Sequence, residues 1–576
     1  VLVCSSALVS LLVLSLGIQG AGWGIFVLMS PESHTVGTMK RIDTLTGENI
    51  LKSGGTAVDA AIAGLICTSV MNPQSSGLGG GVVFTIYNAS TGAVEVINAR
   101  ETVPRVFPDN LLSGCNNVLS CSSDARWIGV PGELRGYEEA HKRHGRLPWK
   151  ALFEPTIKLL SEPLTISPVL HRILHHPLFS RPGESPLLCD GQRFLRQGET
   201  FQWQALKQTL QTVAEQGAAA FYEGEIGRTL VQDIREAGSN LTLEDLRAYK
   251  AEVSSALNIT LNNHTKVFAP GPPMGGAVLM FILKVLEGKF LMEKGHGSLA
   301  TPEEKVQTYH YIAEALKFGN MLRPHMRDPS LLCLQVPLGT LLSDQFAEFV
   351  RKKIDNHGNH SISHYSLMES LYNDKYRSMG TSHISVLAAD SSAVSATSTI
   401  NYPFGSFVYS RRTGIILNNE LADFCIANRS IKAGEHPYPQ NKAQPHGKNI
   451  SASALGEKPT SAMVPSILIS KSGDMLVIGG AGGGWIISAT TMGIINKLWF
   501  GYDLEHAISA PVMHTRGDSV LFEESFSKEV KTGLLGRGHK EKKDALVMNV
   551  VQGISKEGKC ISAYSDKRKL GKSAGY

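Results

Sequence analysis

The sequence predicts an α+β protein in which layers of helices and layers of strands pack against one another. An apolar run of helical length, residues 56–70, precedes two strand-like runs at 82–87 and 94–99. A mainly helical stretch covers residues 133–330, and strand-like runs dominate after Thr381. Strands with separate helical runs, and no internal repeat, indicate layers rather than a barrel of repeats.

Length and composition indicate a globular protein with more than one domain. The chain has 576 residues, and this length alone predicts about two to four domains. Hydrophobic residues make up 42% of the chain and charged residues 19%, with a net charge of +5. That charge is small for the size of the chain, so we expect no nucleic-acid partner.

The first 29 residues predict a membrane anchor. An apolar run begins at Ala7 and continues past Gln19 to Met29, which is about the twenty residues that a helix needs to cross a bilayer. A cleaved signal peptide is the alternative, because the first apolar block has the length of a signal-peptide core. The continuation to Met29 favours an uncleaved anchor. We therefore expect a single-pass type II protein of the plasma membrane, with its bulk outside the cytosol.

Sequons and cysteines suit an extracellular location. Seven N-x-Ser/Thr sequons follow the apolar run, and their number suits a chain exposed to the secretory lumen. The candidate glycosylation sites are Asn88, Asn240, Asn258, Asn263, Asn359, Asn428 and Asn449. Eight cysteines are too few for a disulfide scaffold. In an oxidising compartment Cys115 and Cys121 could form a local bridge, and the sequence does not determine any other pairing.

The elements before residue 381 follow from periodicity and turn residues. The Ala-rich run at 56–70 predicts a buried helix that ends at a turn-rich loop, residues 72–81. The two strand-like runs after this loop are joined by residues 88–92 as a hairpin. Residues 351–380 are polar and rich in His and Asn. Exposed segments of this kind are where a chain can be cut.

The strands after residue 380 are predicted to form hairpins, with one intervening helix at 486–498. The flanking turns contain Asp, Ser and Gly, as hairpin turns require. The predicted pairs are 382–389 with 393–400, and 464–469 with 475–478, followed by C-terminal strands at 546–551 and 560–564.

The step from Gly380 to Thr381 is the most informative point in the chain. Cleavage of this bond would give Thr381 a free α-amine beside its own hydroxyl. Such an N-terminal threonine is a complete nucleophile and base, because the amine can take the hydroxyl proton. The simpler interpretation of these two residues alone is the start of a strand, so the rest of the chain has to decide between the two.

A run of small residues at 479–484 lies between a predicted strand and a predicted helix. It does not match the dinucleotide pattern G-x-G-x-x-G, because Trp485 stands in place of the last glycine, and it lacks the ending of a phosphate loop. Its backbone N–H groups could converge on an anion or on a developing oxyanion. A tight turn that allows close packing is the alternative. No nucleotide cofactor is predicted.

Two other polar patterns are weaker. Glu420 and Asp423 lie three residues apart, and paired carboxylates suit acid–base chemistry, a metal ion or a cationic amine. Taken alone, this segment is better interpreted as a helix start with favourable charge. His171 and His175 have a spacing that can bind zinc, but no HExxH glutamate or obvious third ligand accompanies them. No metal site is predicted.

Taken together, these segments resemble the gamma-glutamyltransferases, a family of the N-terminal-nucleophile hydrolase class. The resemblance runs from about Gly47 to Tyr576 and so covers nearly everything after the apolar segment. The motifs that carry it are 57–61 (AVDAA), 75–81 (SSGLGGG), 98–101 (NARE), 129–133 (GVPGE), 272–276 (PPMGG), 398–401 (STIN), 565–576 and the segment around Thr381.

The resemblance implies a fold and a processing event. The fold would be a four-layer αββα sandwich with a helix-rich segment in the heavy chain. The precursor would cleave itself before Thr381. Residues 30–380 would then form the heavy chain behind the 1–29 anchor, and residues 381–576 the light chain, which begins with the nucleophile. The two chains would form a heterodimer.

The resemblance also assigns catalytic roles. Thr381 Oγ1 would attack the γ-carbonyl of a γ-glutamyl substrate while its own amine serves as the base. Thr399 would hydrogen-bond the Thr381 hydroxyl and orient it. Gly482 and Gly483 would form the oxyanion hole.

Five further residues are implied to bind the amino-acid head of the substrate. Arg100 would pair with the α-carboxylate, whose two oxygens suit a guanidinium fork, and Ser461 would donate to the same carboxylate. Asn401, Glu420 and Asp423 would hold the α-ammonium.

The chain departs from the family pattern beside Ser461. The family usually has Ser-Ser-Met in this segment, whereas this chain has Ser461-Ala462-Met463. Ala462 cannot donate a hydrogen bond, and a hydrogen bond to a charged group contributes about 1.5–3 kcal/mol. We therefore expect weaker γ-glutamyl binding than in a Ser-Ser enzyme.

The implied activity is transfer or hydrolysis of the γ-glutamyl group of glutathione and its S-conjugates, including leukotriene C4. Water, an amino acid or a dipeptide would accept the group, with no cofactor. Another acylase of the same class, such as one acting on β-lactam side chains, is one alternative. The set of Arg100, Glu420 and Asp423 argues against it, because that set recognises a free amino-acid head. An unprocessed surface binding protein is the other alternative, which Ala462 leaves open.

Overall fold

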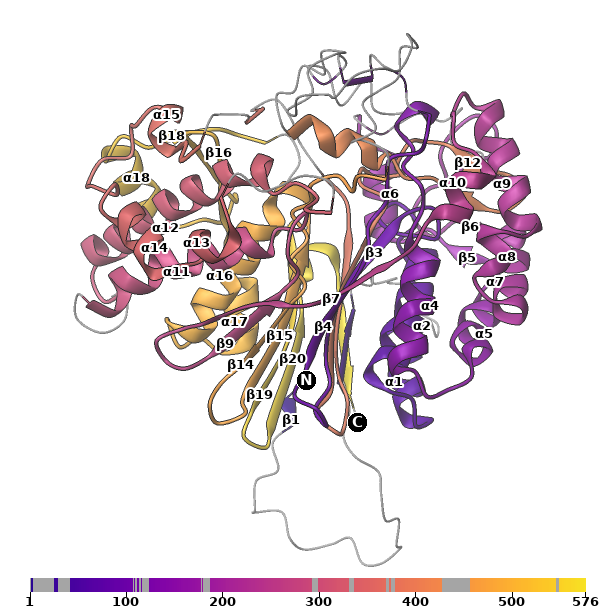
Figure 1. Ribbon diagram of the computed structural model, residues 1–576, viewed down its shortest axis with the longest axis horizontal. Helices are drawn as coiled ribbons and strands as arrows, with labels where there is room; N and C mark the ends of the chain where they lie inside the picture. The colour runs from indigo at the N-terminus through magenta and orange to yellow at the C-terminus, as the bar shows by residue number, and fades with distance from the viewer. Residues whose placement is uncertain are drawn as a thin grey trace, which may run out of the picture.

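The computed structural model shows a four-layer arrangement. It describes residues 2–3, 25–28, 42–106, 108, 111–112, 115, 124–177, 179, 187–292, 299–330, 336–368, 372–373, 379–426, 456–544 and 549–575. Two seven-stranded sheets lie face to face in the middle, and helices cover the outer face of each (Figure 1). The predicted αββα sandwich is confirmed.

The first sheet takes most of its strands from the second half of the chain. Neighbouring strands are antiparallel throughout. Its order is β1 (Leu2–Val3), β20 (Cys560–Ser565), β19 (Val550–Glu557), β15 (Met475–Ala481), β14 (Ser466–Ile469), β9 (Lys266–Ala269) and β8 (Leu257–Thr260).

The second sheet combines strands from both ends of the chain and is also antiparallel. Its order is β21 (Lys572–Gly575), β2 (Ile25–Leu28), β10 (Ser382–Leu387), β11 (Ala393–Thr399), β3 (Gly81–Tyr87), β4 (Val94–Ala99) and β7 (Glu252–Ser255). The predicted hairpins β3–β4 and β10–β11 are confirmed, and they lie side by side because β11 pairs with β3.

One helical layer covers the second sheet and extends away from it. Helix α2 contacts β10 and β11, and α4 contacts β3 and β4. The helices of this half are α1 (Ile42–Lys52), α2 (Ala57–Met71), α4 (Glu133–His144), α5 (Trp149–Leu159), α6 (Pro168–Leu174), α7 (Gln204–Gln216), α8 (Ala219–Tyr222), α9 (Glu225–Glu236) and α10 (Leu243–Ala248).

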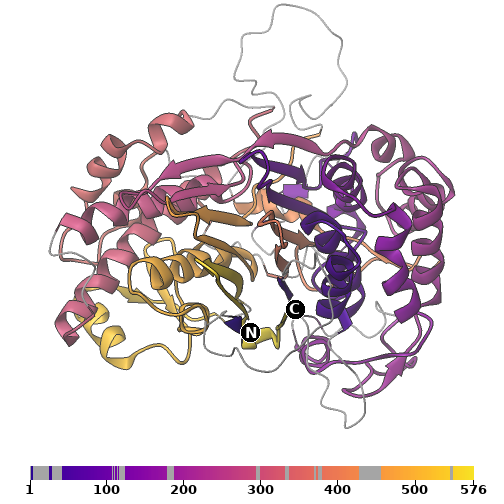
Figure 2. The ribbon, with the colours of Figure 1, turned by 90° about the horizontal axis from the view of Figure 1, so that it is seen from below.

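The other helical layer covers the first sheet, with α16 packed on β15 and β19. Its helices are α11 (Gly276–Met292), α12 (Pro302–Leu322), α13 (Leu338–Leu341), α14 (Asp344–Arg351), α15 (Ile362–Tyr365), α16 (Ile486–Leu498), α17 (Leu504–Ser509) and α18 (Lys528–Gly536). A small sheet of β16 (Met513–Arg516), β17 (Ser519–Phe522) and β18 (Lys540–Glu541) lies among them. Figure 2 shows the two helical layers on opposite sides of the paired sheets. Two short antiparallel pairs, β5 (Leu164–Thr165) with β6 (Thr200–Phe201) and β12 (Tyr409–Ser410) with β13 (Ile415–Ile416), complete the described strands.

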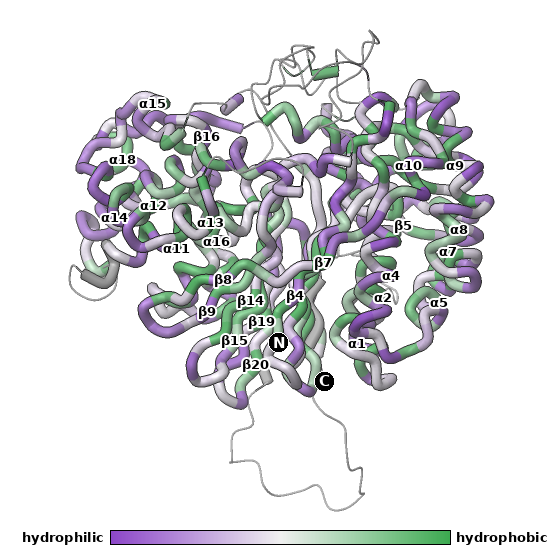
Figure 3. Tube along the Cα trace, in the orientation of Figure 1, coloured by the Kyte–Doolittle hydropathy of each residue, from purple (hydrophilic) through white to green (hydrophobic). Residues whose placement is uncertain are grey.

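The apolar core has one large part on each outer side of the paired sheets. Helix α2 is buried from Ala57 to Val70, as its even apolar composition predicts, and a capping box of Thr56 with Asp59 satisfies its first backbone N–H groups. A smaller cluster that includes Leu387, Val477 and Ile554 fills the space between the sheets. Figure 3 shows hydrophobic residues along the inner elements and most hydrophilic ones at the periphery.

The predicted membrane anchor stays a prediction. Of residues 1–29 the structure describes 2–3 and 25–28, and both segments form strands, β1 and β2. Strand β2 pairs with β10 and β21, so this part of the predicted span belongs to the second sheet. No helix among the residues that the structure describes is long and apolar enough to cross a membrane.

The cysteine prediction is corrected. Cys115 is bonded to Cys425, not to Cys121, with an S–S distance of 2.04 Å across 310 residues of sequence. The fold brings residue 115 beside the 3₁₀ helix Glu420–Ile426, and proximity in sequence carries no information about such a pairing. Cys121 lies outside the described residues.

The sequons that the structure describes lie at accessible positions. Asn88 is half-buried in the turn between β3 and β4, and the other four are exposed: Asn240, Asn258, Asn263 and Asn359. Asn428 and Asn449 lie outside the described residues. Glycosylation of these sites stays a prediction.

Candidate active site

The register of the second sheet places two threonines together. Ser382 of β10 is opposite Ser398 of β11, so Thr381 and Thr399 meet at the same end of the hairpin. Their hydroxyl oxygens are 3.3 Å apart, and both residues are buried. The Thr399 hydroxyl also accepts a hydrogen bond from the backbone N–H of Asn401 at 2.8 Å. The hydrogen bond from Asn401 holds the Thr399 hydroxyl in place beside the Thr381 hydroxyl.

The backbone at the predicted cleavage site has an unusual conformation. Gly380 has φ +110° and Thr381 has φ +91°. A positive φ is strained for a β-branched residue, and such strain costs of order 1–3 kcal/mol. A Cβ on Gly380 would lie 2.0 Å from the carbonyl oxygen of Asn401. Glycine is therefore required before Thr381, and the bond between them is held under strain.

The glycine run meets the same peptide bond. The N–H of Gly482 donates to the carbonyl oxygen of Gly380, with 3.0 Å between nitrogen and oxygen. Gly482 and Gly483 have φ +120° and +58°, which allows the chain to turn from β15 into α16. The run is only partly a loop, because β15 extends to Ala481. The sequence interpretation of 479–484 as one loop is corrected on this point.

The residues predicted to bind the amino-acid head contact one another. Arg100 follows β4 and forms ion pairs with Glu420 and Asp423, and its Nε donates to the carbonyl of Pro459 at 3.0 Å. Arg100 is 1% exposed. The neighbouring carboxylates raise the pKa of Arg100, although its burial acts in the opposite direction. The three side chains thus neutralise much of one another's charge inside the protein.

Glu420 retains a free acceptor. One of its oxygens binds Arg100, whereas Oε2 is buried and has no hydrogen-bond partner among the described residues. Burial raises the pKa of Glu420 well above its usual value, against the opposing effect of Arg100. A buried carboxylate oxygen without a partner is costly. A cationic donor such as an ammonium would satisfy it.

Asn401 and Ser461 complete the predicted set. Asn401 Nδ2 donates to the carbonyl of Asn419 at 3.2 Å, so its amide oxygen is the group that can accept from an ammonium. The Ser461 hydroxyl accepts from the N–H of Met463 at 3.2 Å and keeps its own proton to donate.

A single small pocket is lined by these groups. Ala462 lines it beside Ser461, where a second hydroxyl would be expected. The other lining residues are Arg100, Thr381, Thr399, Asn401, Glu420, Asp423, Met463, Gly483 and Ile486. With Gly482 bonded to Gly380, the structure brings together every residue that the sequence predicted for catalysis and substrate binding.

Comparison with known proteins agrees with this geometry. Residues 44–576 match the protein family described as Gamma-glutamyltranspeptidase. The chain belongs to the gamma-glutamyltranspeptidase family. The family and the enzyme class that the sequence predicted, a gamma-glutamyltransferase of the glutathione hydrolase type, are confirmed.

Individual relatives cover nearly the whole chain. It is 49% identical over 542 residues to "Glutathione hydrolase 5 proenzyme" of Homo sapiens, with 92% of this chain and 90% of that protein covered. It is 33% identical over 545 residues to "Glutathione hydrolase 3" of Arabidopsis thaliana, with 91% and 82% covered. A crystal structure of cephalosporin acylase from Bacillus halodurans has the same fold, with a TM-score of 0.77 at 21% identity over 99% of both chains.

Sequence reasoning did not identify two buried carboxyl groups, those of Glu101 and Glu133, as part of the site. Glu101 lies 3.8 Å from Arg100, and neither of its oxygens has a hydrogen-bond partner among the described residues. Glu133, at the start of α4, accepts a hydrogen bond from the Tyr137 hydroxyl. Burial raises the pKa of each carboxyl to about 8. Glu101 belongs to the NARE motif and Glu133 to the GVPGE motif. Their place in these family motifs is the sequence signal that could have identified both residues.

Asn418 is a second residue that sequence reasoning passed over. Its side-chain nitrogen donates to the carbonyls of Gly79 and Gly129, at 2.7 and 2.9 Å. Its side-chain oxygen accepts from the N–H groups of Gly129 and Glu420, at 2.9 Å each. Asn418 therefore holds the Glu420 backbone against the loops that precede β3 and α4, and so positions the Glu420 carboxylate.

Proposed function

We propose that the chain is a self-processing glutathione hydrolase. It would cleave the γ-glutamyl bond of glutathione and of glutathione S-conjugates such as leukotriene C4. The observation that carries the proposal is one cavity lined by Thr381, Gly483 and a buried set of charges matched to a free amino-acid head. The 49% identity to a protein named glutathione hydrolase 5 proenzyme supports this choice of substrates.

The first step would be cleavage of the chain. Thr381 Oγ1 attacks the carbonyl carbon of Gly380 while the N–H of Gly482 stabilises the developing oxyanion. The carbon–nitrogen bond breaks and the hydroxyl proton passes to the nitrogen, which becomes the amine of Thr381. Water then hydrolyses the ester, which releases the carboxylate of Gly380 and restores the Thr381 hydroxyl. Loss of the positive-φ strain at Thr381 favours this direction.

The second step would be turnover of substrate. The free amine of Thr381 takes the hydroxyl proton, and Oγ1 attacks the γ-carbonyl of the substrate. The C–N bond of the donor breaks, and the proton passes to the leaving amine. The γ-glutamyl ester on Thr381 is then transferred to water or to the amine of an amino acid or dipeptide. Thr399 keeps Oγ1 oriented, and Gly482 and Gly483 hold the oxyanion.

The charged groups would select the γ-glutamyl head. Its α-carboxylate replaces Glu420 and Asp423 as a partner of Arg100, and its α-ammonium is accepted by these carboxylates and by the Asn401 amide oxygen. After this exchange every buried charge still has a partner. A substrate whose acyl group lacks a free amino-acid head cannot provide these partners. It is the reason to prefer glutathione donors to the substrates of the cephalosporin acylase that shares the fold.

The proposal extends to assembly and location. Residues 30–380 and 381–576 would remain together as a heterodimer of heavy and light chains. The apolar run that precedes β2 would anchor the protein in the plasma membrane with the catalytic part outside. The accessible sequons support exposure to the secretory lumen. No cofactor is included in the proposal.

Thr381→Ala tests the mechanism, with Thr381→Ser as the matched variant that retains a hydroxyl. Thr381→Ala should remain one chain on a reducing denaturing gel and should hydrolyse neither glutathione nor leukotriene C4. Thr381→Ser should retain part of both activities. γ-Glutamyl hydrolysis that persists in Thr381→Ala would refute the mechanism. A wild-type chain that stays uncut and inactive would favour the unprocessed binding protein.

A further inference from the structure

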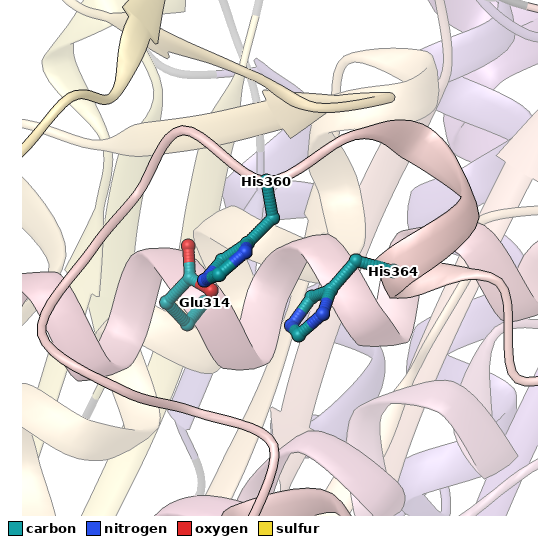
Figure 4. Close-up of side chains that lie close together, drawn as sticks. All are labelled: Glu314, His360 and His364. Carbon is teal, nitrogen blue, oxygen red and sulfur yellow. The ribbon is translucent and has the colours of Figure 1, made fainter.

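A second cluster of titratable side chains lies in the helical layer over the first sheet. It consists of Glu314 on α12, His360 in the segment before α15, and His364 on α15. Each offers one ligand atom, and these three atoms lie within 4.8 Å of one another. Figure 4 shows the two imidazole rings and the carboxylate close together. None of these residues lines the active-site cavity.

The geometry is close to that of a metal site. Zinc binds His nitrogen and carboxylate oxygen at roughly 2.0–2.2 Å, so ligand atoms around one ion are roughly 3.4 Å apart in a tetrahedron. The three atoms here lie within 4.8 Å of one another, an upper limit that is wider than this spacing. The rings of His360 and His364 are stacked, with centroids 4.0 Å apart and planes 15° apart. A ring nitrogen binds a metal in the plane of its ring, so one of the two rings has to turn before both nitrogens can bind the same ion.

The hydrogen-bond partners of the two histidines leave nitrogen atoms for an ion. Nε2 of His364 is buried and has no hydrogen-bond partner among the described residues. Nε2 of His360 contacts Asp355 Oδ1 at 3.1 Å, which leaves Nδ1 for a ligand. A carboxylate on the second nitrogen is the usual way in which a metal-binding histidine is oriented.

Lys317 is a buried neighbour of Glu314 that opposes a cation. Its Nζ lies 3.0 Å from Glu314 Oε1, and the Tyr365 hydroxyl donates to both oxygens of the same carboxylate. Lys317 is fully buried, and burial lowers its pKa. It also contacts the Gly358 carbonyl and His539 Nδ1, at 3.0 Å each. An ion at Glu314 must therefore displace Lys317 Nζ from this carboxylate, and Nζ then keeps the Gly358 carbonyl and His539 Nδ1 as partners.

We propose that Glu314, His360 and His364 bind one divalent transition-metal ion, with zinc as the best match. Two histidines and one glutamate form a ligand set that zinc uses, with a fourth position open to water. The two histidines lie on the polar segment that leads to Gly380, whereas Glu314 belongs to α12. The ion would therefore pin the end of the proposed heavy chain to the helical layer, a structural role that differs from the sequence expectation of no metal.

The other histidine pair of the chain provides a matched control. His171 and His175 have the same spacing, and their rings are 4.1 Å apart. His175 Nδ1 contacts the His171 carbonyl at 2.9 Å. Within the described part of the chain, no carboxylate or cysteine joins this pair as a third ligand. Both histidine pairs therefore have the same spacing. Among the described residues, the pair His360 and His364 has a carboxylate beside it and the pair His171 and His175 does not.

The test is zinc and cobalt binding by the full-length protein after its metals are removed with a chelator. Wild type should retain about one zinc per chain after gel filtration. Co²⁺ should give the visible absorption of a tetrahedral site, which zinc then abolishes. The double variant His360→Ala/His364→Ala should bind zinc at least about 100-fold more weakly. His171→Ala/His175→Ala should bind as wild type does.

Two further readouts keep the test decisive. γ-Glutamyl hydrolysis by the double variant checks that it folds. If it does not fold, Glu314→Gln replaces it in the test, and this variant should also weaken zinc binding. Added zinc should raise the unfolding temperature of wild type but not of His360→Ala/His364→Ala. The proposal is overturned if wild type retains no zinc and shows no cobalt absorption, or if removal of these ligands leaves zinc binding unchanged.

Discussion

The N–H of Gly482 donates a hydrogen bond to the carbonyl oxygen of Gly380, across 3.0 Å. Gly482 belongs to the glycine run before α16, whereas Gly380 provides the carbonyl of the bond that would be cut. A donor at this place polarises the carbonyl and would hold the oxyanion that forms on attack by Thr381. After cleavage the same N–H would face the carbonyl of a substrate. One group thus serves both proposed reactions.

Gly380→Ala should block self-cleavage. Its Cβ would lie 2.0 Å from the Asn401 carbonyl oxygen, and φ at this position is +110°. The peptide must therefore move away from Gly482, and the loss of one oxyanion donor slows such reactions by about 100- to 1,000-fold. A reducing gel over time measures the rate. The control is Gly92→Ala, which also has a positive φ, +70°, but open space around the new Cβ. Wild-type cleavage by Gly380→Ala would contradict the geometry.

Thr399→Val should lower kcat more than it raises KM. Valine has the shape of threonine but removes the oxygen that lies 3.3 Å from the Thr381 hydroxyl and accepts from the Asn401 N–H. A positioned partner of a nucleophile contributes about 10- to 100-fold, and the effect falls on the chemical step. Steady-state kinetics with a γ-glutamyl donor measures the two constants. Thr399→Ser retains the oxygen and should recover most of the rate.

The sequence was enough to predict most of the residues that form the site, but not the contacts that these residues make with one another. Short motifs gave Thr381, Thr399 and Gly482, because catalysis restricts these residue types and the β10–β11 register then brings them together. The pairing of Arg100 with its own acidic neighbours could not be anticipated. This pairing depends on which acidic side chains the fold brings to the buried guanidinium. The spacing of motifs along the sequence does not contain that information.

The same limit explains the other differences between sequence and structure. The Cys115–Cys425 bond joins segments 310 residues apart, and only the fold brings them together. Strand β15 extends three residues into the glycine run, to Ala481, because it pairs with β19 over its whole length. Tertiary pairing of this kind overrides the local preference of glycine for loops.

Ala462→Ser should lower KM for γ-glutamyl donors. Ala462 lines the cavity beside Ser461, so a hydroxyl there can donate to the substrate α-carboxylate. A hydrogen bond to a charged group contributes about 1.5–3 kcal/mol, or roughly 10- to 150-fold in binding. Kinetics with glutathione and with leukotriene C4 measures the change. Ala462→Val adds volume without a donor, so it should not lower KM. An unchanged KM in Ala462→Ser would exclude the missing hydroxyl as the cause of weak binding.

Glu133→Gln should remove part of the pH dependence of stability. Burial raises the pKa of Glu133 from 4.5 to about 8, with the Tyr137 hydroxyl opposing the shift. Between these values the folded protein holds a proton that the unfolded chain releases. The contribution to stability is thus full below pH 4.5 and is lost as pH rises to about 8. The slope for one such group reaches about 1.4 kcal/mol per pH unit.

Thermal unfolding between pH 5 and 8 measures this effect. The unfolding temperature of wild type should fall with pH more steeply than that of Glu133→Gln, since Gln stays neutral throughout. Glu101, whose pKa is also raised to about 8 by burial, leaves a residual slope in the variant. Glu154→Gln removes an exposed carboxyl on α5 and should follow wild type. Equal slopes for wild type and Glu133→Gln would show that Glu133 is ionised in the folded protein.

The Cys115–Cys425 bond should join the two products of self-cleavage covalently. Cys115 lies before the Gly380–Thr381 step and Cys425 after it, so the bond connects residues 1–380 to residues 381–576. Processed enzyme should therefore run as one species on a non-reducing denaturing gel and as two species after reduction. Cys560 is also disulfide-bonded, so Cys425→Ser alone should still run as one species without reductant. The double variant Cys425→Ser/Cys560→Ser removes both cysteines of residues 381–576 and should give two species under both conditions. Cys189→Ser provides the control, since it leaves this bond intact. Separation of the wild-type fragments without reductant would disprove the link.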